Sequence, residues 1–311
     1  NQIIILIICS FLLFFNSWVI MLFNTYEPWK FAFSQENSDL DQVEEGSWGI
    51  IGVPFDSTTS YHSGARFGPT VVREASFGFE KYNSVFDTFI DTIFYDFGDV
   101  NIIPGNCKKT CDIIEDTVNE ISEFNVKPIL IGGEHSASIG ALKSLTEQYD
   151  DLTIVHLDAH RDLADDFIGE KYSHATVMRR AHDFGLEELI QIGIRSASKE
   201  EEDFANEKEN ITTFNNINVF HHLDGIEYYL DNIKTPVYLS IDMDVLDPSV
   251  APSVGNPTPF GLSIRDVEII LKVISQKNVI GMDVVETATK KLGELTAVTA
   301  SKLIYDFLSL I

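Results

Sequence analysis

Short, continuous apolar runs that alternate with helical patterns are the feature of this sequence that most limits its possible folds. Eight such runs predict β-strands, at residues 48–55, 92–100, 127–132, 152–158, 189–194, 218–222, 236–242 and 279–285. Most are apolar at nearly every position, as expected for strands that are covered on both faces. The sequence therefore predicts a three-layer α/β/α fold with a mainly parallel eight-stranded sheet.

Two of the intervening helices are indicated by the spacing of their apolar residues. One contains Ile114, Val118 and Ile121, and the other follows a predicted N-cap at Ser263 with Asp266 in its first turn. No repeat or low-complexity linker divides residues 48–311, so we expect one catalytic domain there. In such sheets, ligands bind beyond the carboxyl ends of the strands.

The N-terminal residues differ from the rest of the chain. Residues 1–23 form an apolar segment, and its apolar stretch is long enough to span a bilayer. It lacks the positive charge of a signal peptide, since the first basic residue is Lys30. We expect this segment to precede the mature protein, which would start at Met21; a membrane anchor and a cleaved signal are the alternatives. Residues 24–47 are an acidic lead-in, and we expect the protein to be cytoplasmic.

The charge balance excludes one class of partner. The chain has 48 acidic and 22 basic side chains, a formal charge of −26. Nucleic-acid phosphates would be repelled by this surface. The acidity is consistent either with solubility alone or with attraction of a cationic substrate.

Ligand-type residues follow two of the predicted strands. Residues 158–162 read Asp-Ala-His-Arg-Asp, and residues 242–244 read Asp-Met-Asp. Alternate side chains of an extended segment share a face, so the acidic groups and the imidazole of each motif converge. Unpaired carboxylates at a buried strand end repel each other, and a cation would relieve that repulsion. A polar turn or a helix cap is the alternative for each motif; Asp247, before a proline, is expected to be a turn residue.

Two further strands end in similar residues. Residues 131–136 read Ile-Gly-Gly-Glu-His-Ser, which would bring His135 to the same edge, and Glu286 follows the last strand. A phosphate-binding loop is the competing interpretation of the two glycines, but no Gly-Lys-Ser/Thr element follows. The candidate metal ligands number two histidines and four aspartates: His135, Asp158, His160, Asp162, Asp242 and Asp244.

This set suits two divalent ions better than one. Four carboxylates balance the charge of two ions, and a pair of ions can lower the pKa of a shared water. Oxygen-rich ligation without cysteine favours manganese over zinc. A bridging hydroxide and Glu286 would make the pocket negative, which favours a cationic substrate.

Three of these blocks, residues 132–136, 158–162 and 240–248, resemble the signature motifs of the ureohydrolases, the arginase/agmatinase family. The resemblance runs from about residue 48 to the C-terminus and includes the Gly-Ala-Arg-Phe-Gly-Pro segment at 64–69. It implies the arginase-like fold, two Mn²⁺ ions per subunit and a homo-oligomer, a trimer or hexamer. It also implies two overlapping ligand sets. One is His135, Asp158, Asp162 and Asp242, and the other is Asp158, His160, Asp242 and Asp244.

The resemblance further implies catalytic roles. Glu286 would bind and orient a guanidinium group, Asp162 would hydrogen-bond the hydroxide and pass its proton to the leaving amine, and His174 would shuttle protons. Ser253 and Phe260 occupy positions where relatives often have glycine, which puts specificity in doubt more than metal binding.

The expected substrate is agmatine, which would give putrescine and urea. The loop at 163–172 is acidic and lacks the Asn- and Ser-rich pattern with which arginases bind an amino acid head group. Aminopropyl-agmatine, guanidinobutyrate and arginine are the alternatives. A one-metal deacetylase of the related fold and a non-catalytic scaffold are the rival classes, but no ligand has been lost.

Overall fold

The computed structural model describes residues 25–26, 29–36 and 39–311. The predicted N-terminal segment at 1–23 lies outside this part of the chain. Within the described residues, no helix is both long and apolar enough to cross a membrane.

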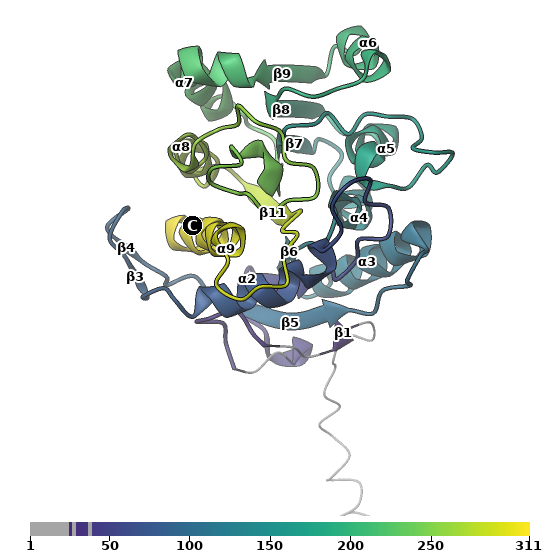
Figure 1. Cartoon of the computed structure of the whole chain (residues 1–311). Helices are drawn as coiled ribbons and strands as arrows, with labels where there is room; N and C mark the ends of the chain where they lie inside the picture. The colour runs from purple at the N-terminus through teal and green to yellow at the C-terminus, as the bar shows by residue number, and fades with distance from the viewer. Residues whose placement is uncertain (1–24, 27–28, 37–38) are drawn as a thin grey trace, which may run out of the picture.

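A nine-stranded sheet forms the centre of the molecule (Figure 1), in the order β1-β5-β2-β6-β11-β10-β7-β8-β9. Eight of its strands are parallel, and only the two-residue strand β1 runs antiparallel, along β5. The mainly parallel eight-stranded sheet is therefore confirmed. The strands are β1 (Thr25–Tyr26), β2 (Trp48–Gly52), β5 (Phe94–Val100), β6 (Lys127–Ile131), β7 (Thr153–Leu157), β8 (Glu188–Ile194), β9 (Ile211–Asn215), β10 (Val237–Asp242) and β11 (Val279–Val285).

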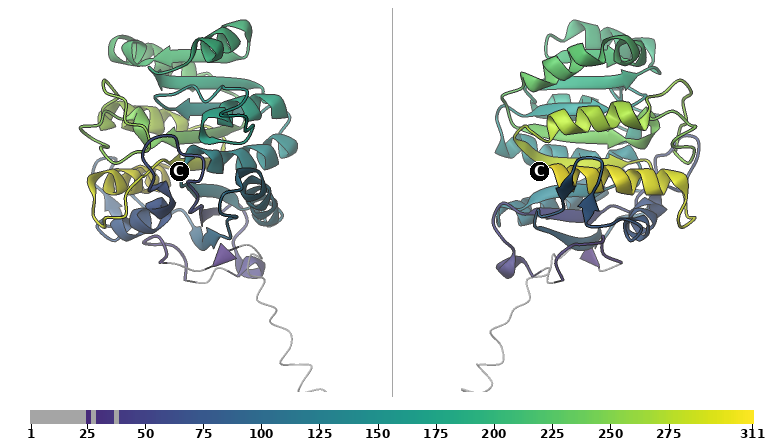
Figure 2. Two further views of the ribbon diagram at one scale, coloured as in Figure 1. Left: turned by 45° about the vertical axis from the view of Figure 1, so that its right-hand side comes forward. Right: turned by 90° about the vertical axis from the view of Figure 1, so that its left-hand side faces the viewer.

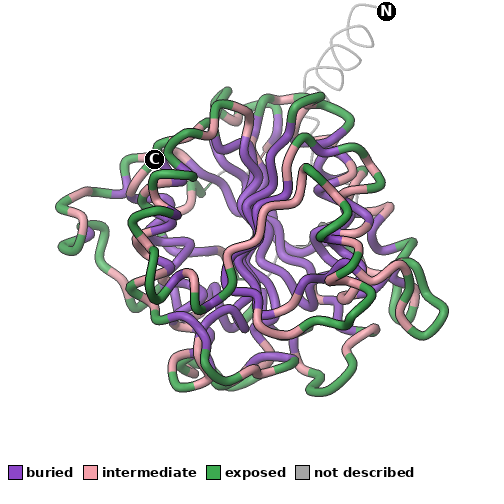
Figure 3. The backbone as a smooth tube through the Cα atoms, turned by 90° about the horizontal axis from the view of Figure 1, so that it is seen from above, coloured by how far each residue is buried: buried purple, intermediate pink, exposed green. Residues whose placement is uncertain are grey.

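Helices cover both faces of the sheet. One layer consists of α2 (Gly68–Ser76), α7 (Asn216–Asp231), α8 (Ile264–Ile274) and α9 (Leu295–Leu310), and the right-hand view of Figure 2 looks onto it. The other consists of α3 (Cys107–Ser122), α4 (Ser138–Gln148), α5 (Val177–Phe184) and α6 (Lys199–Glu207). Each layer has its own apolar core against the sheet, which explains why the strand sequences are apolar throughout. Figure 3 shows the buried strands running through the middle of the molecule.

Short elements complete the fold. Strands β3 (Tyr82–Asn83) and β4 (Thr88–Phe89) form a small hairpin. Five 3-10 helices are described, η1 (Leu40–Gln42), η2 (Ala65–Phe67), η3 (His135–Ala137), η4 (His174–Thr176) and η5 (Met243–Val245). Three of these, η3, η4 and η5, contain predicted site residues.

One predicted strand is wrong. Residues 218–222 lie in helix α7, and the strand precedes them as β9. Asn215 caps the helix, because its side chain accepts a hydrogen bond from Asn218 N–H and the Asn218 side chain accepts one from Asn215 N–H. Edge strand β9 contains Thr212 and Thr213, so it has no apolar run that would mark it. Helices α3 and α8 confirm the spacing argument, and Ser263 forms the predicted cap with Asp266.

Candidate metal centre and active site

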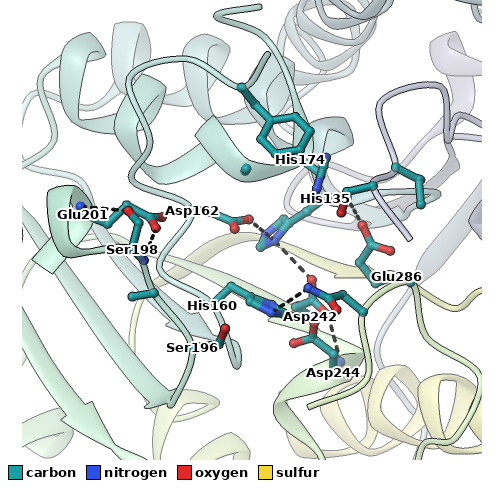
Figure 4. A pocket seen from close by; sticks show the side chains of 17 residues that line it. His135, His160, Asp162, His174, Ser196, Ser198, Glu201, Asp242, Asp244 and Glu286 are labelled. Carbon is teal, nitrogen blue, oxygen red and sulfur yellow. Dashed lines mark hydrogen bonds and ion pairs between the residues drawn. The ribbon is translucent and has the colours of Figure 1, made fainter. Parts of the chain in front are cut away.

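The carboxyl ends of four neighbouring strands, β6, β11, β10 and β7, bring the predicted residues together. His135 follows β6, Asp158 follows β7, Asp242 ends β10, and Glu286 follows β11. Figure 4 shows Asp162, His160 and Asp244 around the same space. These side chains are far apart in sequence, and the parallel register of the sheet places them at one edge.

The two nitrogens of His135 have different surroundings. Its Nε2 lies 3.0 Å from Ser240 Oγ, which itself donates to Asp283 Oδ1 at 2.9 Å. Ser240 therefore accepts from Nε2–H, which leaves Nδ1 with a lone pair. Nδ1 faces Asp158, Asp162 and Asp242 at 3.1, 3.0 and 3.3 Å, yet forms no hydrogen bond. A lone pair that faces three carboxylates is repelled by them, and a cation between them would relieve that repulsion.

The aspartate oxygens are held by backbone groups. Asp158 Oδ1 accepts from His160 N–H at 2.6 Å, and Asp242 Oδ1 accepts from Asp244 N–H at 2.8 Å. Asp244 Oδ1 accepts from Ala159 N–H at 3.1 Å. Each of these carboxylates keeps its second oxygen near a histidine nitrogen. The oxygens are thus fixed before any ion arrives, and the donor set of imidazole and carboxylate fits divalent manganese.

Mutual repulsion and burial dominate the electrostatics of this group. Desolvation and the charge of Asp158 raise the pKa of Asp162 to about 6. Desolvation and nearby carboxylates also raise the pKa values of Asp242 and Asp244. The pKa of Asp158 is lowered instead, because contacts with His156, His135 and His160 outweigh its desolvation. The carboxylates lack sufficient positive charge from the chain itself, which again fits a metal site.

His160 lies on the outer side of this group. Its Nδ1 is 2.9 Å from Asp244 Oδ2 and 3.4 Å from Asp158 Oδ1, and its Nε2 is 3.0 Å from the side-chain amide of Asn256. Despite desolvation, the two aspartates raise the pKa of His160 to about 12. The ring thus turns Nδ1 toward the carboxylates, as His135 does. The ligand atoms therefore form two groups, each close enough together to hold a metal ion. One group lies around His135 with Asp158 and Asp162, and the other around His160 with Asp158 and Asp244.

Glu286 points one oxygen into the cavity. Its Oε1 accepts from His135 N–H at 2.9 Å, whereas its Oε2 is buried without a hydrogen-bond partner. Desolvation and the nearby charge of Glu134 raise the pKa of Glu286 to about 8. A Cβ on Gly255 would lie 2.5 Å from Oε2, so a larger residue at this position would occupy the space beside the oxygen. The geometry is suited to an incoming cation that donates hydrogen bonds.

His174 lies on the loop that closes the cavity. Its Nδ1 is 3.2 Å from Thr58 Oγ1, and its ring packs edge-on against Phe167. Desolvation and the nearby His160 and His135 lower the pKa of His174 to about 4. The imidazole is therefore neutral near pH 7, so it can accept a proton.

Two residues that the sequence did not single out support this arrangement. The buried carboxylate of Glu134 accepts from Thr58 N–H at 2.7 Å and from Ser136 Oγ at 2.6 Å, which fixes the loop at 57–60 over the cavity. The second residue is His156, which is buried on β7. Gln191 donates to its Nδ1 at 3.1 Å, so Nε2–H donates to Asp158 at 2.8 Å. His156 lies on β7 and Asp158 follows it, two residues apart in the sequence. This spacing places both side chains on the same face and could have predicted their contact.

Asp247 is the turn residue that the sequence predicted. Its carboxylate accepts hydrogen bonds from Ser249, Phe260 and Gly261 backbone N–H groups. Phe260 has a φ of 70°, a left-handed conformation that favours glycine. This backbone conformation explains why glycine would be favoured at position 260. The hydrogen bonds to the Asp247 carboxylate hold the loop in place despite the strain.

The predicted site residues surround one cavity of about 180 Å³. All eight contribute to it, seven as lining and Asp158 from beneath, through its contacts with His135 and His160. Among the described residues that line it, five are acidic and none is lysine or arginine: Asp162, Glu201, Asp242, Asp244 and Glu286. The cavity is therefore suited to a cation.

A family model described as "Arginase family" matches residues 47–309. The chain belongs to the arginase family. It is 40% identical over 289 residues to the N(1)-aminopropylagmatine ureohydrolase of Thermococcus kodakarensis, covering 90% of this chain and 94% of that protein. It is 39% identical to the agmatinase of Bacillus subtilis, covering 85% and 92%. The crystal structure of agmatine ureohydrolase of Thermoplasma volcanium superposes with a TM-score of 0.81 at 31% identity, covering 92% and 94%.

These findings confirm the family resemblance and the arginase-like fold. The protein is an arginase-family ureohydrolase, a hydrolase that acts on guanidino C–N bonds. The individual roles of the site residues, the metal, the substrate and the oligomer stay predictions.

Proposed function

We propose that this arginase-family protein hydrolyses agmatine to putrescine and urea with two Mn²⁺ ions per subunit. The observation that carries the proposal is the acidic cavity, in which the buried Glu286 Oε2 has no partner beside a cluster of four aspartates. A guanidinium ion is a planar cation with several N–H donors, which complements such an oxygen.

The ligand sets are those that the family resemblance implies, and the contacts of His135 and His160 support them, although the contact of Asp242 is with His135. His135 with Asp158, Asp162 and Asp242 would hold one ion, and Asp158, Asp242 and Asp244 with His160 would hold the other. When bound, two such ions supply a nucleophile from water at neutral pH and a Lewis acid. The hydrogen bonds from Ser240 and His156 fix the orientation of His135 and Asp158 toward them.

Glu286 would bind and orient the substrate. Because its Oε1 is fixed by His135 N–H, its Oε2 has a defined direction into the cavity. A guanidinium at this oxygen would also keep the carboxyl group ionised, opposing the desolvation that raises its pKa. Orientation of the guanidinium carbon in this way contributes to the rate because the reacting groups are held in place.

Asp162 and His174 would handle protons. Asp162 would accept the proton of the hydroxide at its carboxylate and release it to the leaving amine. His174 is neutral near pH 7 and contacts Thr58 at the edge of the cavity, where a proton can be exchanged between the leaving amine and solvent.

The substrate preference rests on charge. Arginine brings a carboxylate, and no lysine or arginine among the described residues lines the cavity to bind it. Agmatine has an ammonium group or a simple amine at that end instead. The 40% identity to an aminopropylagmatine ureohydrolase supports aminopropyl-agmatine as the second candidate; guanidinobutyrate and arginine rank below both.

A urea-release assay tests this proposal. The chain is loaded with Mn²⁺ and given agmatine, arginine and guanidinobutyrate at equal concentrations. We expect kcat/KM for agmatine to exceed that for arginine by about 100-fold or more, as for a site that leaves a carboxylate unpaired. A preference for arginine would defeat the agmatine assignment.

Metal analysis separates the rival class. Two manganese ions per subunit support the ureohydrolase site, whereas one zinc would favour a deacetylase of the related fold. Homo-oligomerisation and a cytoplasmic location stay predictions; light scattering on the purified protein checks the former.

A further inference from the structure

A second cavity adjoins the metal cavity. It has a volume of about 600 Å³ and lies between three loops, at 57–60, 105–108 and 167–173. Thr59, Ser60 and Phe167 line both cavities, so these three residues form a shared wall. A linear ligand that leaves the metal cavity past Phe167 would enter this second space.

The second cavity contains two charged side chains, and only one of them has an ion-pair partner in the described part of the chain. Its lysine, Lys108, pairs with Asp112 and lies over the ring of Tyr172, 5.1 Å from the centroid. Its carboxylate, Glu170, is exposed and forms no ion pair with a basic side chain in the described part of the chain. The lysine has a carboxylate partner, whereas Glu170 has no basic one, and this difference favours a ligand with positive charge.

The apolar part of the second cavity comes from the loop that carries Glu170. Phe167 and Glu170 exchange backbone hydrogen bonds at 2.9 and 3.0 Å, and Asp166 accepts one from Gly169. This turn holds Ile168 at a φ of 54° with 88% of its surface exposed. Together with the rings of Phe167 and Tyr172, the Ile168 side chain provides apolar surface for methylene groups, and the rings can face an ammonium.

We propose that the second cavity binds the aminoalkyl arm of a longer guanidino amine, a linear compound in which a second amine follows the first along an aliphatic chain. The guanidinium lies at Glu286, the first amine passes Phe167, and the terminal ammonium reaches Glu170. This inference rests on the proposed hydrolysis of agmatine, because it extends the same substrate at the end opposite the guanidinium. It makes the protein a ureohydrolase whose specificity includes aminopropyl-agmatine.

Substrate comparison tests the inference. We expect aminopropyl-agmatine to be hydrolysed with a kcat/KM at least equal to that for agmatine. Glu170→Gln lowers kcat/KM for the longer substrate by about threefold to fivefold, the effect of one solvated ion pair, and leaves agmatine within twofold. Glu170→Lys lowers it further in the same direction. The matched control is Glu207→Gln, an exposed carboxylate at the end of α6 that lines neither cavity.

A steric variant and product inhibition give independent measurements. Ser57 is exposed and lines only the second cavity, so Ser57→Trp would fill that cavity and reduce turnover of the longer substrate selectively. The triamine spermidine, left when urea departs from the longer substrate, should inhibit more strongly than putrescine in the native protein, and the two should become similar in Glu170→Gln.

The outcomes separate this inference from the proposed function. If agmatine is hydrolysed but the longer compound is a poorer substrate and is insensitive to Glu170 and Ser57, the second cavity has no role in substrate binding. If inorganic phosphate competes with the longer substrate and Glu170→Lys strengthens that competition, the cavity is an anion site and the inference is wrong. If neither guanidino amine releases urea while arginine does, the proposed function itself is wrong.

Discussion

Two buried groups of charged residues lie beside the same sheet, and in only one of them do a basic side chain and carboxylates of the chain pair with each other. Near β5, Arg73 is fully buried and its Nε and Nη2 donate to Asp96 at 2.7 and 2.8 Å, while Nη1 pairs with Asp99. At the other group, Asp158, Asp162, Asp242 and Asp244 contact three histidines, and in the described part of the chain no ion pair joins them to an arginine or lysine side chain.

The difference indicates the role of each group. Coulombic attraction and hydrogen bonds to Asp96 and Asp99 overcome the desolvation of Arg73 and raise its pKa, so this cluster is complete without a ligand. The aspartates at the strand ends have raised pKa values instead, apart from Asp158, which is the mark of missing positive charge. A buried acidic group of that kind is a site for a cation from outside the chain.

The largest expected effect comes from removing the internal cation. Arg73→Met leaves two buried carboxylates without a partner, so the free energy of unfolding should fall by about 3–5 kcal/mol. Urea unfolding measures this change. Lys199→Met, which breaks an exposed ion pair with Asp203, is the control and should cost under about 1 kcal/mol. An equal loss in both variants would contradict the distinction between buried and exposed pairs.

Substitution of Glu286, the proposed substrate-binding carboxylate, should lower turnover. Glu286→Gln keeps the size of the side chain but removes the charge that would hold the guanidinium, so kcat/KM for agmatine should fall by about 100- to 1,000-fold. Metal content should change little, because Glu286 is outside both proposed ligand sets and its Oε1 is engaged by the backbone. Nearly unchanged turnover would remove Glu286 from the proposed mechanism.

The comparison predicts opposite signs for two similar substitutions. In metal-free protein, Asp242→Asn should raise the unfolding free energy by about 1 kcal/mol, because it relieves repulsion that raises the pKa of Asp242. Asp96→Asn should lower it, since Arg73 then loses half of its charge balance. Unfolding in a chelator measures both. If Asp242→Asn also destabilises the metal-free protein, the acidic cluster is neutralised in a way that the contacts do not reveal.

The last expected effect is a pH dependence. The pKa values of Asp162 and Glu286, raised to about 6 and about 8, mean that the folded metal-free protein binds more protons than the unfolded chain between about pH 4 and pH 8. Its unfolding free energy therefore falls as pH rises through this window, and Tm should fall by about 2–4 °C per kcal/mol lost. Saturation with Mn²⁺ should flatten the dependence. A metal-free Tm that rises from pH 6 to pH 8 would contradict the assigned shifts.

Local patterns predicted much of this molecule. Continuous apolar runs identified seven of the strands, and the cap at Ser263 located α8. The candidate ligands could be named because residues that follow parallel strands must meet at one edge of a sheet. The strand predicted at 218–222 was wrong because β9 is a half-polar edge strand, whose sequence carries no apolar run.

The sequence by itself determined which residues reach the strand ends, since this depends on alternation and position along single segments. Only the tertiary structure decided which nitrogen of His135 faces the carboxylates, that Glu134 fixes the loop at 57–60, and that a second cavity opens beyond Phe167. These features arise between segments far apart in the chain. Their contacts depend on rotamers and loop packing that no local pattern encodes.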